Sequence, residues 1–219
     1  ATLAANVVAL VVLAVQVLPD GRVEEVTGNW PVGVGITLRA DALGVLFAVL
    51  SSAVLLAATA HEVLDGVRER VFPGVVVLLS AGLTGVFLTG DIFNFYVFFE
   101  LSMVTGYILA TYGGTRRELG AALIFTTVNL LGTFVFLLSV AGLYHVTGTL
   151  DMGRAAARVA NVDPNAAILI AVGFFAAFCV KLGLFPFHFW LPTVYTGARP
   201  AVAAILSGGL ANIGAYGLL

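Results

Sequence analysis

Long apolar runs recur along the chain, separated by short polar or charged stretches. A helix needs about 20 mostly apolar residues to cross the hydrocarbon core of a bilayer, and the runs have about that length. They do not alternate between polar and apolar positions, as the strands of a membrane β-barrel do. The pattern predicts an all-α bundle of about seven transmembrane helices, over residues 2–18, 42–60, 72–90, 92–111, 119–144, 166–185 and 200–219.

The arginines between these runs predict the orientation of the bundle. Short cytoplasmic loops of membrane proteins are enriched in Lys and Arg. When alternate loops are assigned to opposite sides, one group of arginines falls in the shorter loops, and we expect it to face the cytoplasm of a cell whose membrane the chain crosses several times. This group holds Arg68, Arg70, Arg116, Arg117 and Arg199, and the opposite group holds Arg22, Arg39, Arg154 and Arg158.

Composition supports a membrane protein. The chain is 60% hydrophobic and 10% charged, whereas soluble chains are about 45–50% apolar and about 25% charged. A net charge of −2 leaves no basic surplus, so we expect the lipid bilayer and not nucleic acid as a partner. Cys179 is the single cysteine, and it can form neither an internal disulfide nor a structural zinc site.

The sequence holds no Gly-rich phosphate loop, nucleophile elbow or cluster of metal ligands. We therefore predict no cofactor and no metal, and a transporter subunit rather than an enzyme. The first residues carry neither Met nor a basic segment, and the last residues lie inside an apolar run. We expect residues 1–219 to be a single transmembrane domain that is a fragment of a longer protein.

A carboxylate stands in the middle of one predicted helix. Glu100 lies midway through residues 92–111, among aromatic and aliphatic neighbours. A charge at the centre of a bilayer costs about 2.5–3.5 kcal/mol on insertion scales, so a chain that keeps one has a partner or a use for it. The alternatives are a proton-carrying group and a structural ion pair within the bundle.

A lysine near the end of residues 166–185 is the second intramembrane charge. Lys181 could form a pair with Glu100, in which burial and the partner's charge together set the proton affinity of both groups. The alternative is that its long side chain reaches the membrane interface from the helix end. The pair is the stronger hypothesis because two opposite charges occur in one apolar chain.

Two prolines after Lys181 predict a broken helix near residues 181–200. Pro186 and Pro192 interrupt helical hydrogen bonding inside an apolar stretch. Discontinuous helices of this kind form ion sites in transporters. His188 lies between the prolines, and its ordinary pKa of about 6.5 suits a proton relay. The alternative is a histidine that bonds the carbonyls freed at the break.

Smaller polar residues give weaker indications. Thr126, Asn129 and Thr133 share one face of the helix 119–144 and could line a hydrated path. We favour the alternative that they bond the preceding turn of their own helix. Asp91 and Asn94 begin a helix, where a cap is the more common role than an ion ligand.

Three stretches together resemble a known family. Residues 90–100 resemble the glutamate-bearing helix of antiporter-like membrane subunits, residues 180–192 resemble their broken, lysine-bearing helix, and residues 201–219 look like the helix that follows. The loops 28–31 and 148–152 look most like the D subunit of Mrp-type Na⁺/H⁺ antiporters. The same family includes proton-pumping subunits of complex I and of membrane-bound hydrogenases.

The resemblance implies a fold of about fourteen helices with two inverted five-helix repeats. This chain would cover roughly the second to eighth helices, and so only the first repeat. It also implies that Glu100 and Lys181 form a coupled pair in the proton path and that His188 takes part. Many members carry a Lys or His where this chain has Asn212, which can only orient water. Thr193 stands where many members have an acidic residue.

These observations give three hypotheses. In the first, the chain is a proton-translocating subunit of a multisubunit cation/proton antiporter, with other membrane subunits as partners and protons and Na⁺ as the transported ions. In the second, it is the corresponding subunit of a complex I-like NADH:quinone oxidoreductase or of a membrane-bound hydrogenase. In the third, it is a scaffold that transports nothing, and the charges only fix helix packing.

Overall fold

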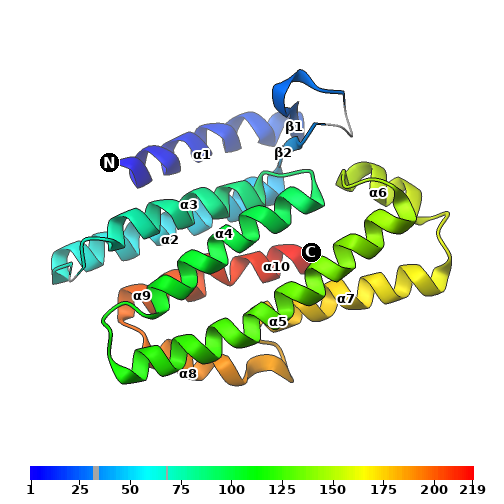
Figure 1. Cartoon of the computed structure of the whole chain (residues 1–219). Helices are drawn as coiled ribbons and strands as arrows, with labels where there is room; N and C mark the ends of the chain where they lie inside the picture. The colour runs from blue at the N-terminus through cyan, green and yellow to red at the C-terminus, as the bar shows by residue number, and fades with distance from the viewer. Residues whose placement is uncertain (32–34, 68) are drawn as a thin grey trace.

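The computed structural model describes all of residues 1–219 except 32–34 and 68, so Arg68 lies outside the described residues. All seven predicted stretches form helices in the bundle of Figure 1. The helices are α1 (Thr2–Asp20), α2 (Ala42–Asp65), α3 (Phe72–Phe87), α4 (Ile92–Ala110), α5 (Arg116–Thr147), α6 (Met152–Val159), α7 (Pro164–Leu182), α8 (Trp190–Gly197), α9 (Pro200–Ile205) and α10 (Asn212–Leu218).

Length and hydropathy confirm a polytopic membrane chain. Within the described residues, six helical segments are long and apolar enough to cross a membrane, and one of them runs from Pro164 to Gly197 through the predicted break. The seventh predicted stretch, α3, is apolar but has 16 residues, fewer than the typical span. Extra helical residues at the ends of α2 and α5 extend both helices beyond their predicted limits.

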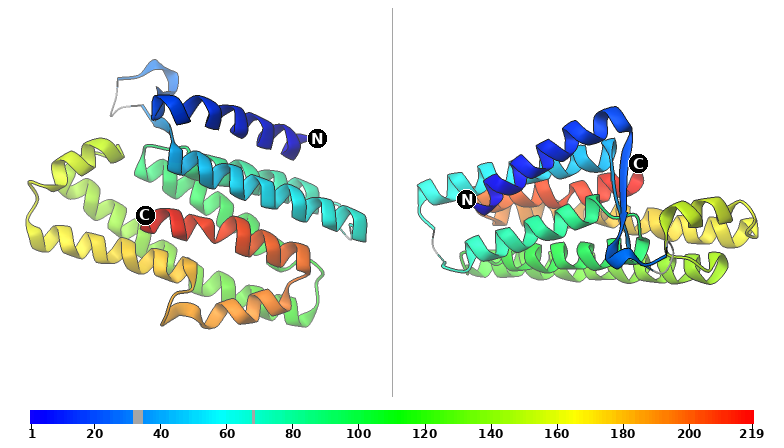
Figure 2. Two further views of the ribbon diagram at one scale, coloured as in Figure 1. Left: turned by 180° about the vertical axis from the view of Figure 1, so that it is seen from behind. Right: turned by 90° about the horizontal axis from the view of Figure 1, so that it is seen from above.

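The helices lie side by side in two groups joined at the centre. α1 packs on α2, which packs on α3, and α3 packs on α4. α5 packs on α7 and α8, and α4 on α5 connects the two groups. α9 and α10, with a π-helical turn at Leu206–Leu210 between them, run through the middle against α2 and α7 (Figures 1 and 2). The last helix of the chain therefore borders both groups.

Two elements lie in stretches that the sequence marked only as polar loops. Residues 19–41 contain an antiparallel hairpin of β1 (Arg22–Val26) and β2 (Thr37–Asp41), in which Arg22 pairs with Asp41 and Val26 with Thr37. Residues 145–165 contain the short helix α6. β2 alternates polar and apolar residues over only five positions, and two adjacent glutamates interrupt the alternation in β1, so the pattern could not be distinguished from a loop.

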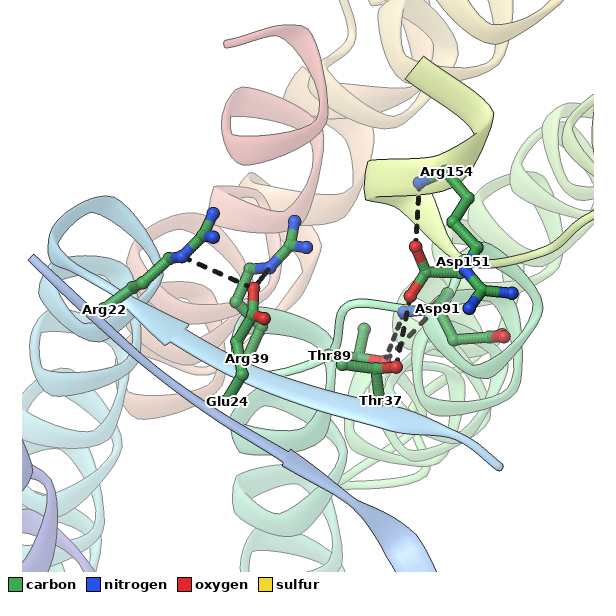
Figure 3. A network of polar contacts seen from close by, with 8 residues as sticks. All are labelled: Arg22, Glu24, Thr37, Arg39, Thr89, Asp91, Asp151 and Arg154. Carbon is green, nitrogen blue, oxygen red and sulfur yellow. Dashed lines mark hydrogen bonds and ion pairs between the residues drawn. The ribbon is translucent and has the colours of Figure 1, made fainter. Parts of the chain in front are cut away.

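A polar cluster joins these elements at one end of the bundle (Figure 3). The Thr37 hydroxyl donates to Asp151 Oδ2 over 3.1 Å, and Asp151 caps α6 by accepting from Arg154 N. Asp91 pairs with Asp151 through a β-bridge. The hairpin, the start of α4 and the α5–α6 loop are thereby held together.

Asp91 is an N-cap, as the sequence predicts. Its Oδ1 accepts from Asn94 N over 2.7 Å, and the Asn94 amide donates to the Thr89 hydroxyl over 3.0 Å. Burial raises the pKa of the Asp91 carboxyl, the backbone N–H groups of Asn94 and Phe93 counteract this, and the charge of Asp151 adds a smaller increase. The folded protein thus holds the Asp91 proton more tightly than the unfolded chain does.

We expect Asp91→Asn to change how stability depends on pH. A carboxyl with a raised pKa stabilises the fold fully below its ordinary pKa of 3.8 and loses that contribution as pH rises through the raised value. Asparagine caps a helix about as well as aspartate and stays neutral. The unfolding temperature of the variant in detergent should therefore gain on the wild type as the pH rises above 3.8. Asp163→Asn, at the exposed cap of α7, is the control, and parallel curves for Asp91→Asn and the wild type would contradict the expectation.

Candidate functional site

Lys181 lies inside the bundle, in the last turn of α7. The residue is 5% exposed, so its side chain does not extend to the surface from the helix end. The amine donates to the Asn129 carbonyl and to the Thr133 hydroxyl of α5, each over 3.0 Å. It also lies 4.3 Å from the centre of the Phe99 ring, where the face of the ring attracts a cation. Every one of these partners is neutral.

Glu100 follows Phe99 on α4 and is half-buried. Its Oε1 atom is buried without a hydrogen-bond partner. The carboxylate interacts electrostatically with Lys181, but none of the ion pairs in the described part of the chain joins the two residues. Glu100 and Lys181 therefore influence each other's charge without forming a direct ion pair.

Aromatic contacts place Glu100 and the polar residues of α5 at one level. Tyr96 stacks on Phe136 at 6.4 Å, and Tyr107 meets Phe125 edge-on at 5.3 Å. Because α4 and α5 are antiparallel neighbours joined by a short turn, these two contacts set their register. Glu100 lies between the two tyrosines on α4, and the polar residues that hold Lys181 lie between the two phenylalanines on α5.

The small polar residues of α5 bond their own helix and also serve the lysine. The Asn129 amide donates to the Phe125 carbonyl and the Thr133 hydroxyl to the Asn129 carbonyl, as the favoured alternative predicted. Asn129 Oδ1 is buried without a partner. Thr126 is half-buried and is neither a hydrogen-bond partner of Lys181 nor part of the adjoining cavity.

A narrow cavity adjoins Lys181. Its polar lining includes Lys181, Asn129, Trp190 and Tyr195, and Leu206 and Leu210 of the π-helical turn form part of its apolar lining. The space open to the centre of a water molecule is about 10 Å³, close to the least that holds one water. The site can therefore bring a water molecule to the amine.

The helix is broken directly after Lys181. α7 ends at Leu182, and Gly183 adopts a left-handed conformation with φ 63°, which glycine tolerates without strain. A 3₁₀ turn at Phe187–Phe189 then leads into α8. This confirms the break predicted near residues 181–200.

Two predicted residues neither bond the Lys181 amine nor line the cavity beside it. His188 is exposed on the 3₁₀ turn and stacks on Phe185 at 5.8 Å. Asn212 donates to the Ser51 hydroxyl of α2 over 2.9 Å and to the Gly208 carbonyl over 2.7 Å. Its neighbour Ala211 lines the cavity in its place.

A second buried charge cluster, which the sequence did not predict, lies at the C-terminal end of α2. Glu62, expected in a charged loop, lies in the last turns of α2 and is 1% exposed. Arg199 Nη1 is 3.0 Å from Glu62 Oε1, in an ion pair whose N–H direction does not form a hydrogen bond. Tyr112 donates to the same oxygen over 2.9 Å, and Arg199 Nη2 lies 2.9 Å from the exposed Asp65.

The helical spacing of buried residues could have revealed Glu62. Ser52, Leu55, Ala58 and Glu62 follow one another at intervals of three and four and are all buried, which is one continuous helix face.

Among the described residues, no group of three or more His, Cys, Asp or Glu could hold a metal ion. The ionisable groups described at the site are the buried Lys181 amine and the half-buried Glu100 carboxylate.

Comparison with known proteins gives a consistent result. Residues 89–219 match the family model described as NADH:quinone oxidoreductase/Mrp antiporter, TM. The D subunit of the Na⁺/H⁺ antiporter of Alkalihalophilus pseudofirmus is 37% identical over 211 residues, which are 94% of this chain and 43% of that protein. The D subunit of a probable K⁺/H⁺ antiporter of Rhizobium meliloti is 38% identical over 91% of this chain and 37% of its own length.

Solved structures show the same fold. The Mrp complex of Dietzia sp. DQ12-45-1b matches 98% of this chain with a TM-score of 0.90 and 31% identity, over 41% of the matched chain. An archaeal membrane-bound sulfane sulfur reductase matches 98% with a TM-score of 0.91 and 26% identity, over 45% of its chain. The chain thus spans less than half the length of these relatives.

We expect Arg199→Ala to destabilise the protein strongly. The substitution leaves the Glu62 carboxylate, whose side chain is 2% exposed, without its cation, and breaking a buried pair in this way costs about 3–5 kcal/mol. Unfolding in detergent measures the loss. Asp65→Ala removes the 61% exposed partner and should cost at most about 1 kcal/mol. Adding Glu62→Gln to Arg199→Ala should recover part of the loss, and equal effects of Arg199→Ala and Asp65→Ala would refute a specific role for the buried pair.

Proposed function

Since the chain belongs to the NADH:quinone oxidoreductase/Mrp antiporter transmembrane family, we propose that it is the proton-translocating part of a D-type subunit in a multisubunit Na⁺/H⁺ antiporter of the cell membrane. The predicted resemblance to the D subunit is confirmed by the relatives. Antiport itself, the coupled Na⁺ and the partner subunits are carried over from what those relatives are named for. The observation that supports proton translocation in this chain is the buried Lys181 amine beside a water-sized cavity.

In the proposed mechanism, Glu100 controls the charge of Lys181. The amine is held only by neutral groups of Asn129, Thr133 and Phe99, so a distant charge has a large influence on it in this weakly polarisable interior. When Glu100 is ionised, the charged amine is favoured, and when Glu100 is protonated, the amine releases its proton more easily. Lys181 exchanges that proton with water in the adjoining cavity.

In this proposal, His188 lies at the outer end of the proton path. Because it is exposed on the turn after Pro186, any transfer between Lys181 and His188 has to pass through water. Asn212 faces α2, so its proposed part is to hold the π-helical turn beside the cavity and not to contact the amine. Thr126 has no step in the proposed path.

A redox-driven complex is the alternative that a specific observation favours. The sulfane sulfur reductase, described as an archaeal respiratory membrane complex, matches this chain as closely in fold as the Mrp complex does. The intramembrane proton chemistry would be the same, and electron transfer in other subunits would drive it. The neighbouring genes distinguish the two, because small antiporter subunits accompany one and iron–sulfur subunits the other.

We expect Glu100→Gln to lower antiport in everted membrane vesicles by about 100-fold or more, since a positioned proton-transfer group contributes roughly 10²–10⁴-fold. The amide keeps the shape of the side chain but cannot ionise, so the complex should still assemble, which co-purification of its other subunits measures.

Glu25→Gln, the same change at an exposed position of β1, is the matched control and should transport normally. Normal antiport in Glu100→Gln would rule out the mechanism. Loss of assembly together with loss of antiport would instead support the scaffold hypothesis.

A further inference from the structure

Two buried oxygens on one face of α4 have no hydrogen-bond partner. They are Glu100 Oε1 and the Tyr107 hydroxyl. A buried polar group left unpaired costs about 1–3 kcal/mol, and native proteins satisfy nearly all such groups with protein or bound water. The two oxygens are therefore candidates for a shared partner.

Helix geometry places them on one face of α4. Tyr107 comes two turns after Glu100 on α4, so both side chains lie on one face with about 10.5 Å between their Cα atoms along the axis. Long side chains in helices lean toward the N-terminus, and because the Tyr107 side chain is longer than that of Glu100, this common lean shortens the separation between the hydroxyl and the carboxylate. The charge of Glu100 also acts on the Tyr107 phenol, which supports this placement.

The chemistry of the two groups is complementary. An ionised carboxylate only accepts hydrogen bonds, whereas a phenol both donates and accepts. A water molecule between them can donate to Glu100 and accept from Tyr107. The ring contact with Phe125 at 5.3 Å fixes the phenol in this position.

Along α4, Tyr107 lies between Glu100 and the C-terminal end of the helix. Ala110 ends the helix, and the turn to Arg116 follows, where the chain reaches the exposed residues Thr115, Arg116 and Arg117. Lys181 interacts with Glu100 at the level of Asn129 and Thr133 on α5. The Tyr107 hydroxyl thus adds a polar group to Glu100 and Lys181 on the side of the α4–α5 turn.

We propose that Tyr107 is a relay residue, joined to Glu100 through bound water, by which protons reach Glu100 from the α4–α5 end of the bundle. The phenol gives its proton to the bridging water, that water gives one to Glu100, and the phenol takes another proton from the side of the turn. Tyr107 stays neutral overall and no electrons move. The proposal rests on the proposed role of Glu100 as a proton carrier.

Tyr107→Phe tests the relay in the assembled complex. The change removes only the oxygen and keeps the ring against Phe125. Antiport in everted vesicles should fall about 10-fold, less than in Glu100→Gln, because a second water can partly replace the hydroxyl. The ratio of rates in H₂O and D₂O should rise, and the pH profile should shift, since proton delivery becomes limiting. Tyr144→Phe is the control, because Tyr144 is exposed near the C-terminal end of α5, beyond the level of Glu100 that the ring contacts set.

An infrared measurement separates this proposal from the mechanism on which it depends. The C=O stretch of protonated Glu100, identified as the band that Glu100→Gln removes, should shift in Tyr107→Phe and stay in place in Tyr144→Phe. If Glu100→Gln transports normally, the proposed function fails, while the band shift still tests the Tyr107–Glu100 link. If Glu100→Gln is inactive but Tyr107→Phe shows wild-type rates and an unshifted band, the relay is overturned. Equal losses in both tyrosine variants would also overturn it.

Discussion

The arrangement of the site depends on how one buried ammonium group is held. Lys181 has lost nearly all contact with solvent, and an ammonium in such a place is costly unless it is hydrogen-bonded. Two acceptors on α5 and one aromatic face on α4 meet it. The contact between α5 and α7, the break after Leu182 and the cavity beside the amine all follow from bringing these groups together.

The separation of Glu100 from Lys181 has a physical consequence. A direct ion pair in an apolar interior would hold both charges strongly, and a group held in that way exchanges protons slowly. Charges that interact over a longer distance influence each other by an amount that small movements and nearby water can change. The aromatic contacts between α4 and α5 keep Glu100 and the partners of Lys181 at one level. They therefore maintain the coupling without closing the pair.

The sequence predicted the features that depend on the type of a single residue. It did not predict features that depend on the direction in which a side chain points. Long apolar runs predicted the helices, and the rarity of charge in lipid pointed to Glu100 and Lys181. The Glu62–Arg199 cluster was missed because its members are far apart in the chain and each stands near a loop, where a charge is ordinary. The directions of His188 and Asn212 depend on the turn after Pro186 and on the π-helical turn. Local spacing contains neither, so the sequence could not show that His188 is exposed and that Asn212 bonds Ser51 of α2.

The ion pairs of the described residues lie at the two ends of the bundle, and only the Glu62–Arg199 pair among them is buried. The pairs among the described residues join Arg22 or Arg39 to Glu24 at the hairpin, and Arg199 to Glu62 and Asp65 at the far end of α2. Between them lie the neutral bonds to Lys181 and the unpaired oxygens of Glu100, Tyr107 and Asn129. Ion pairs buried in protein resist rearrangement because separating them exposes uncompensated charge, whereas bonds through water exchange readily. The buried Glu62–Arg199 pair therefore holds its end of the bundle more firmly than bonds through water would hold the middle, where the proposed proton transfer takes place.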